Sequence, residues 1–168
     1  MSVFYEFDEV SAFTVGTVGR PGERIFLLQA RADGQRVTVK CEKQQTAAIV
    51  QYLRRVLADL PPAEDRPMSG ALELRDPLDA AFVLGPIGLG YDRSNDRVLI
   101  QLEEVSEVDE EGEPVDNDDR GHVRLYLSRG QAAAFCDQAD SVVEAGRPAC
   151  QWCAFPMDPD GHDCPRMN

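Results

Sequence analysis

The pattern of apolar and polar residues predicts β-strands in some segments of this chain and α-helices in others. The order of strands followed by a helix occurs twice. Short apolar segments near Phe13, Ile25 and Val37 predict three β-strands, because they are brief, rich in β-branched residues and bounded by turn residues. A helical period follows from about Glu42 to Leu60, and Pro61 directly after it predicts the end of that helix. The first part of the chain therefore predicts a strand-strand-strand-helix unit.

The second part of the chain repeats this order with matching residues. Phe13–Gly19 and Phe82–Gly88 share the pattern Phe-x-aliphatic-Gly-x-aliphatic-Gly. Further matches join Ile25–Gln29 to Val98–Leu102, and Val37–Ala48 to Val123–Ala134. A second helix is predicted to begin after Ser128, where the sequence Ser-Arg-Gly-Gln forms a capping box. Similarity over a long, constant order indicates an internal duplication.

Short turns connect the predicted strands, except that the second unit carries an acidic insertion in place of its second hairpin turn. Asp33-Gly34 is a two-residue hairpin signal, since both central positions of that turn favour positive φ. Strands joined by such turns run antiparallel. We therefore expect an α+β fold of two related β-β-β-α units with mainly antiparallel sheets around a shared core.

The predicted boundaries follow the composition. The duplicated domain covers residues 1–146, with units at about 3–60 and 71–146 and a linker at 61–70 that is rich in proline and acids. Residues 147–168 form a separate C-terminal tail.

The formal net charge of −13 argues against nucleic acid as a partner and against an anionic membrane surface, because phosphate binding depends on clustered lysine and arginine. Ten acids and no bases lie between Glu103 and Asp119, so we expect an acidic insertion at 103–119 in the second unit. The sequence contains neither a long apolar segment nor a secretory signal, which predicts a cytoplasmic protein.

The C-terminal tail carries a candidate metal site. Cys150 and Cys153 have the two-residue spacing of a zinc knuckle, and a turn at 159–161 returns the chain to His162 and Cys164. Three thiolates and one imidazole would close the tetrahedron around one zinc ion, which is typical of a structural site and not of a catalytic one. A redox Cys-x-x-Cys pair is the alternative.

Three large apolar residues accompany the predicted knuckle: Trp152, Phe155 and Met157. A tail of this size cannot bury them internally. They are expected either to pack on the body or to contact a protein partner.

The sequence contains no recognisable catalytic set, so the predicted function is that of a non-enzymatic, zinc-containing binding or adaptor protein. The alternative is an enzyme or ligand-binding protein for a small phosphorylated or nucleotide ligand, held in the groove between the two units. Tyr91, Arg93, Arg97 and Arg124 are the candidate ligand-binding residues for that alternative.

The paired units, and above all the ending with Cys150-x-x-Cys153 and Asp158-Pro-Asp-Gly-His162-Asp-Cys164, resemble an uncharacterised actinobacterial family of the domain of unknown function 3090 type. The resemblance implies an actinobacterial cytoplasmic protein with a similar C-terminal zinc knuckle, and it implies no reaction or substrate. Gln151, Trp152 and Ala154 depart from the residues that are usual in the family at these positions.

Overall fold

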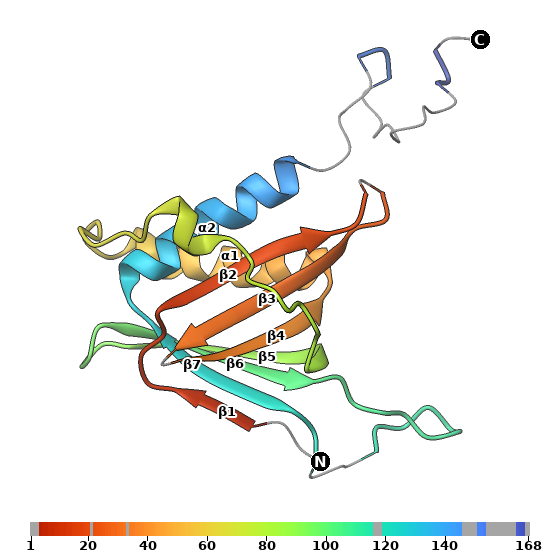
Figure 1. Ribbon diagram of the computed structural model, residues 1–168, viewed down its shortest axis with the longest axis horizontal. Coiled ribbons are helices and arrows are strands. Elements are labelled where there is room, and N and C mark those ends of the chain that lie inside the picture. Colours follow the sequence, from red (N-terminus) through yellow and green to blue (C-terminus); the bar gives the residue numbers. More distant parts are fainter. Residues whose placement is uncertain are drawn as a thin grey trace.

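The computed structural model describes residues 4–20, 22–32, 34–115, 119–145, 151–153 and 164–166 of the chain. These residues form one mixed β-sheet with two helices packed on it (Figure 1). The strands are β1 (Phe4–Phe7), β2 (Ala12–Val18), β3 (Ile25–Ala32), β4 (Gln35–Cys41), β5 (Phe82–Asp92), β6 (Arg97–Glu104) and β7 (His122–Leu127), and the helices are α1 (Lys43–Ala58), α2 (Arg129–Glu144) and the 3₁₀ helix η1 (Ser69–Leu72). The predicted α+β class is confirmed.

The prediction of a mainly antiparallel sheet is wrong, because the sheet is mixed. Its strand order is β1-β7-β6-β5-β4-β3-β2. The pairs β2–β3, β3–β4 and β5–β6 are joined by short turns and are antiparallel, and β6–β7 is antiparallel across a longer connection. In contrast, β4 pairs with β5 and β1 pairs with β7 in parallel. The connection from β4 to β5 contains α1 and the linker, so it is long enough to return the chain in the same direction. The strand β1 is an additional element that the sequence pattern did not predict.

One face of the sheet carries the main hydrophobic core. Every second residue of each strand points to this face, because successive side chains of a β-strand lie on opposite faces of the sheet. Phe13 of β2 stacks on Phe135 of α2 with ring centroids 4.8 Å apart. Ile49 and Leu53 of α1 are fully buried in the same core. The helices therefore cover this inner face, as predicted from their apolar stripes.

Capping interactions determine where α2 begins. The Ser128 hydroxyl accepts a hydrogen bond from the backbone N–H of Gln131, and the Gln131 side chain accepts one from the backbone N–H of Ser128. This reciprocal pair satisfies two N–H groups that the first helical turn cannot bond internally. The predicted capping box is confirmed.

The chain that links the two units lies across the outer face of β2, β3 and β4 (Figure 1). A polar row that is almost fully buried, Thr14, Gln29 and Thr38, crosses these three strands in register. The Gln29 amide donates to the Arg75 carbonyl at 2.9 Å and accepts from the Arg75 N–H at 2.9 Å, and it also donates to the Thr38 hydroxyl at 3.1 Å. We call residues 71–76 the strap, because they are fastened to the sheet in this way.

A glycine makes room for the strap on the edge strand. An ideal Cβ placed on Gly16 would lie 2.5 Å from a methyl carbon of Leu74. The Leu74 side chain thus occupies the space that any larger residue at position 16 would fill. The outer face of the first three-strand unit is covered by chain, as the inner face is covered by helices.

The predicted acidic insertion connects β6 to β7, and it contains a small turn closed by a bridge between Val108 and Pro114. Asp109 accepts hydrogen bonds from two backbone N–H groups of that turn.

No helix within the described part of the chain combines the length and the apolar character needed to cross a membrane.

Candidate functional site

A surface cavity of about 750 Å³ lies where β1, the linker, the β5–β6 turn and the start of α2 meet. Segments from both halves of the sequence contribute to it, so the fold assembles it from distant parts of the chain. The residues that line it are Asp8, Glu9, Val10, Asp65, Arg66, Pro67, Asn95, Asp96, Arg97, Tyr126, Leu127, Ser128 and Gln131.

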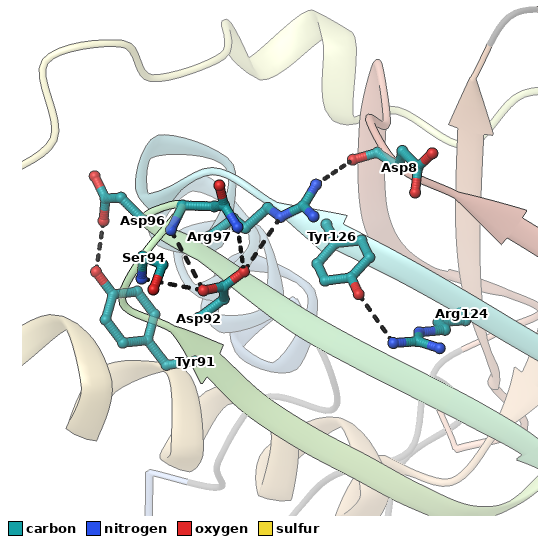
Figure 2. A network of polar contacts seen from close by, with 9 residues as sticks. Asp8, Tyr91, Asp92, Ser94, Asp96, Arg97, Arg124 and Tyr126 are labelled. Atoms are coloured by element: carbon teal, nitrogen blue, oxygen red, sulfur yellow. Dashed lines mark hydrogen bonds and ion pairs between the residues drawn. The ribbon is translucent and has the colours of Figure 1, made fainter.

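The tight turn between β5 and β6 forms one wall of this cavity. The Asp92 carboxylate accepts hydrogen bonds from the backbone N–H groups of Ser94 and Asn95 and from the Asn95 side chain (Figure 2). Asp and Asn favour such turns because their short side chains can bond to backbone two residues further on. The Asn95 side chain, followed by the backbone bonds, lowers the pKa of Asp92 below its ordinary value.

Arg97 lies at the centre of the network in Figure 2. Its guanidinium carbon is 3.8 Å from the centroid of the Tyr126 ring, which is a cation–π geometry. The same guanidinium donates to the Asp8 carbonyl at 3.4 Å and lies 3.8 Å from the Asp92 carboxylate. Arg97 therefore joins β1, the β5–β6 turn and β7 at the edge of the cavity.

Two further interactions position the turn beside α2. The Tyr91 hydroxyl donates to one oxygen of Asp96 at 2.6 Å, and Nε of Arg129 donates to the other at 3.0 Å. The Tyr91 hydrogen bond is the main cause that lowers the pKa of Asp96, and the same bond raises the pKa of Tyr91. Asp96 has φ of 52°, a left-handed conformation that aspartate adopts more readily than most residues.

The linker forms the opposite wall of the cavity, where it passes over the first turn of α2. A Cβ on Gly130 would lie 2.1 Å from the Asp65 carbonyl oxygen, so the chains approach as closely as they do because position 130 is glycine. Arg66 pairs with Asp137 of α2 at 2.8 Å. Gln131 donates to the Val10 carbonyl at 2.7 Å and so holds the β1–β2 connection at the same place.

The charges around the cavity do not balance. Four carboxylates and two guanidinium groups line it. Both guanidinium groups already contact acids, and Asp96 already contacts Arg129. The side-chain carboxylates of Asp8, Glu9 and Asp65 form no hydrogen bond or ion pair with any described residue. The lining of the cavity thus includes three acidic residues whose carboxylates no described residue neutralises.

The structure brings some of the predicted ligand-binding residues together and separates others. Arg97 lines the cavity, and Arg124 lies beside it on β7, where it donates to the Tyr126 hydroxyl at 3.0 Å (Figure 2). Tyr91 contacts the cavity through Asp96 only. Arg93 is exposed in the β5–β6 turn and is not part of the lining.

Sequence reasoning missed the three unneutralised carboxylates, and it missed Tyr126. Asp8 and Glu9 are adjacent acids between β1 and the next apolar segment. Such a pair indicates a polar loop in the sequence but not a binding site. Nothing in the linear sequence indicates that this loop meets Asp65 and the start of α2. Only the tertiary fold places them around one cavity.

The predicted zinc ligands are only partly described. Cys153 is half-buried and Cys164 is buried, while Cys150 and His162 lie outside the described residues. Within the described ranges no three histidine, cysteine, aspartate or glutamate side chains are grouped as a metal site requires. The donor set that the sequence provides, three thiolates and an imidazole, is chemically suited to zinc.

The aromatic and methionine residues of the tail are also only partly described. Trp152 is 55% exposed. Phe155 and Met157 lie outside the described residues.

The two cysteines of the body, Cys41 and Cys136, are buried. Burial raises the pKa of Cys136 to about 11, and burial is also the main cause that raises the pKa of Cys41. Both thiols therefore remain protonated at neutral pH, which makes them poor nucleophiles and poor metal ligands.

Together, these features define a class: an α+β protein with a mixed seven-stranded sheet, a helical layer on one face and an acid-rich cavity at the start of α2. The chain belongs to the family described as "Protein of unknown function (DUF3090)", whose sequence profile matches residues 5–164. No curated protein and no solved structure gives a significant match to the chain.

Proposed function

We propose that this is a non-enzymatic binding protein that holds a small ligand in the cavity at the start of α2. The observation that carries this proposal is the convergence of four separate segments on one cavity of about 750 Å³. That volume is in the range of ordinary small-molecule sites, which often lie where parts of a fold meet.

The charges of the lining favour a cationic ligand, such as an amine or a guanidinium compound. Asp8, Glu9 and Asp65 carry carboxylates that pair with no described residue, whereas Arg66 and Arg97 already contact acids. An anionic ligand would have to compete with those acids for the two arginines, and it would also approach the three unpaired carboxylates. The sequence suggested a phosphorylated or nucleotide ligand as an alternative. The charges of the lining residues match such an anionic ligand less well than a cationic one.

A binding role is preferred to an enzymatic one because the cavity's polar groups serve structural purposes. The Ser128 hydroxyl caps α2, and the Gln131 amide bonds to Ser128 and Val10. The described lining contains no histidine or cysteine that would activate a nucleophile.

Ligand-dependent thermal stabilisation of the full chain tests this proposal. Putrescine, agmatine and arginine are compared with inorganic phosphate and AMP, and the double variant Asp8→Asn, Glu9→Gln is compared with Arg93→Gln as an exposed control outside the lining. We expect amines to raise the melting temperature of the wild type and of the control, and to have little effect on the double variant. Stabilisation by the phosphates alone would contradict the cationic assignment, and no stabilisation by either group would contradict a small-ligand site.

We propose in addition that Cys150, Cys153, His162 and Cys164 hold one structural zinc ion, and that the zinc-containing tail and the acidic insertion serve as an adaptor surface. The burial of Cys164 supports this, since thiolate ligands of structural zinc are shielded from solvent. Metal analysis of the purified protein under reducing conditions should give close to one zinc per chain, and Cys150→Ser should lower it to a small fraction. Less than about half an equivalent in the wild type would refute the site.

The internal duplication, the actinobacterial origin and the cytoplasmic location are also proposals. The order β2-β3-β4-α1 followed by β5-β6-β7-α2 supports the first of them. The motif of the tail supports the other two.

A further inference from the structure

The outer faces of the two three-strand units carry similar features at matching positions. The first two strands of each unit form a hairpin, and residue pairs can be counted from its turn. The third pair is Gly16 with Leu27 in the first unit and Gly90 with Leu99 in the second. By the same count, Gln29 corresponds to Gln101. Each outer face therefore has a glutamine on its central strand and a glycine one row closer to the hairpin.

Other described residues contact these matching positions in the first unit but not in the second. Gln29 is fully buried and forms a pair of hydrogen bonds with the Arg75 backbone, and Leu74 fills the space above Gly16. In contrast, the Gln101 side chain forms no hydrogen bond with any described residue, and a Cβ placed on Gly90 would meet nothing within 4 Å. The second outer face thus has the receiving groups of the first, and no segment among the described residues covers them as the strap does.

We propose that the outer face of β5, β6 and β7 binds an extended, acidic peptide segment of a partner protein, with a leucine-like side chain over Gly90 and its backbone paired to Gln101. The strap on the first unit is the evidence for the binding mode, because it shows how this arrangement of glycine and glutamine holds the segment that follows η1. The inference concerns a surface beside the cavity and does not depend on the proposed small ligand.

The charges of this face indicate that the segment is acidic. Arg124 lies beside Gln101 in register, where the first unit has Thr38 beside Gln29. Glu6 is the neighbour of Arg124 on β1, but the two side chains form no ion pair, and among the described residues the Arg124 guanidinium donates to the neutral Tyr126 hydroxyl and to no carboxylate. A carboxylate on the peptide would give Arg124 the charged hydrogen bonds that it lacks.

A peptide probe derived from the strap tests this inference. A labelled, end-blocked peptide with the sequence of residues 71–76, carrying Arg75→Glu, is titrated with the full chain and followed by fluorescence polarisation. We expect saturable binding, weakened by about tenfold or more when Leu74→Ala is introduced into the peptide. In the protein, Gln101→Ala removes two hydrogen bonds to the peptide, which corresponds to about a tenfold loss of affinity.

Gly90→Val is the most direct variant, because its side chain would enter the proposed leucine position from a Cβ that meets no atom within 4 Å. Gly70→Val is its matched control, since a Cβ there also meets nothing within 4 Å. We expect Gly90→Val to abolish peptide binding and Gly70→Val to leave it unchanged, with both proteins folded by circular dichroism. Absence of binding to the wild type at millimolar peptide, or equal binding to Gly90→Val, would overturn the inference. A wild-type dimer in sedimentation that Gly90→Val dissociates would also overturn it, because a second copy would then cover this face.

Discussion

Replacement of Gln29 by alanine should reveal how strongly the strap stabilises the body. The Gln29 side chain is fully buried and makes three hydrogen bonds, two with the backbone of Arg75 and one with Thr38. A typical buried hydrogen bond contributes about 1 kcal/mol net, and a partner left unsatisfied in the interior adds to the loss. We therefore expect Gln29→Ala to lower the free energy of unfolding by about 3 to 4 kcal/mol, a large fraction of the total stability of a domain of this size.

Equilibrium urea unfolding, followed by far-ultraviolet circular dichroism, measures this loss. With a urea dependence of about 2 kcal/mol per molar, the midpoint should fall by roughly 1.5 to 2 M. Trypsin should also cleave the native variant faster after Arg75, because the strap would detach locally more often.

Gln101→Ala is the matched control for Gln29→Ala, because the two glutamines have corresponding positions but Gln101 has no partner among the described residues. Its effect on the free energy of unfolding should stay within about 0.5 kcal/mol, as for other surface substitutions. Equal losses in the two variants, or a loss below about 1 kcal/mol in Gln29→Ala, would refute the assigned role of the buried polar row.

Three other predictions follow from the described contacts. Ser128→Ala removes the cap of α2 and should cost about 1 kcal/mol in urea unfolding, whereas Ser128→Asp, which preserves an acceptor, should restore most of it. With a pKa of about 11, Cys136 should be about 0.1% thiolate at pH 8, so the native protein should react with iodoacetamide at this position far more slowly than the urea-unfolded protein; equal rates would contradict its burial. The folded-state pKa of Asp96 is lowered by Tyr91, so its stabilising contribution is present above the unfolded-state pKa near 4 and is lost as the pH falls further. Asp96→Asn should therefore destabilise the protein at pH 6 and do so much less at pH 2.5, and an equal effect at both pH values would exclude this ionic role.

Local signals in the sequence predicted the elements of this fold well. The hairpin signal at Gly34, the capping box at Ser128 and the prolines after α1 each act within a few residues, so they can be recognised in the linear chain. The apolar stripes likewise predicted the helical faces that pack in the core.

Pairings between distant segments could not be predicted in the same way. The residues of β1 carry no signal that selects β7 as their partner, since parallel pairing is determined by the assembled sheet. The cavity depends on the same long-range contacts. Arg97 was predicted as a ligand-binding residue because arginine commonly binds anionic ligands, whereas nothing in the sequence singled out Asp8 and Asp65. The buried role of Gln29 also escaped prediction, because a polar residue in a strand normally indicates the solvent face.

The parallel pairing of β1 with β7 has a consequence for synthesis on the ribosome. Residues 4–7 are made early, but their partner strand at 122–127 is made more than a hundred residues later. At about 5 to 20 residues per second, β1 must wait roughly 6 to 25 s after its own synthesis before it can pair. During that interval Phe4, Tyr5 and Phe7 have no sheet to join. The strand of this sheet that is synthesised before all the others is therefore among the last to enter the fold, and the nascent chain carries an aromatic segment that chaperones would be able to bind.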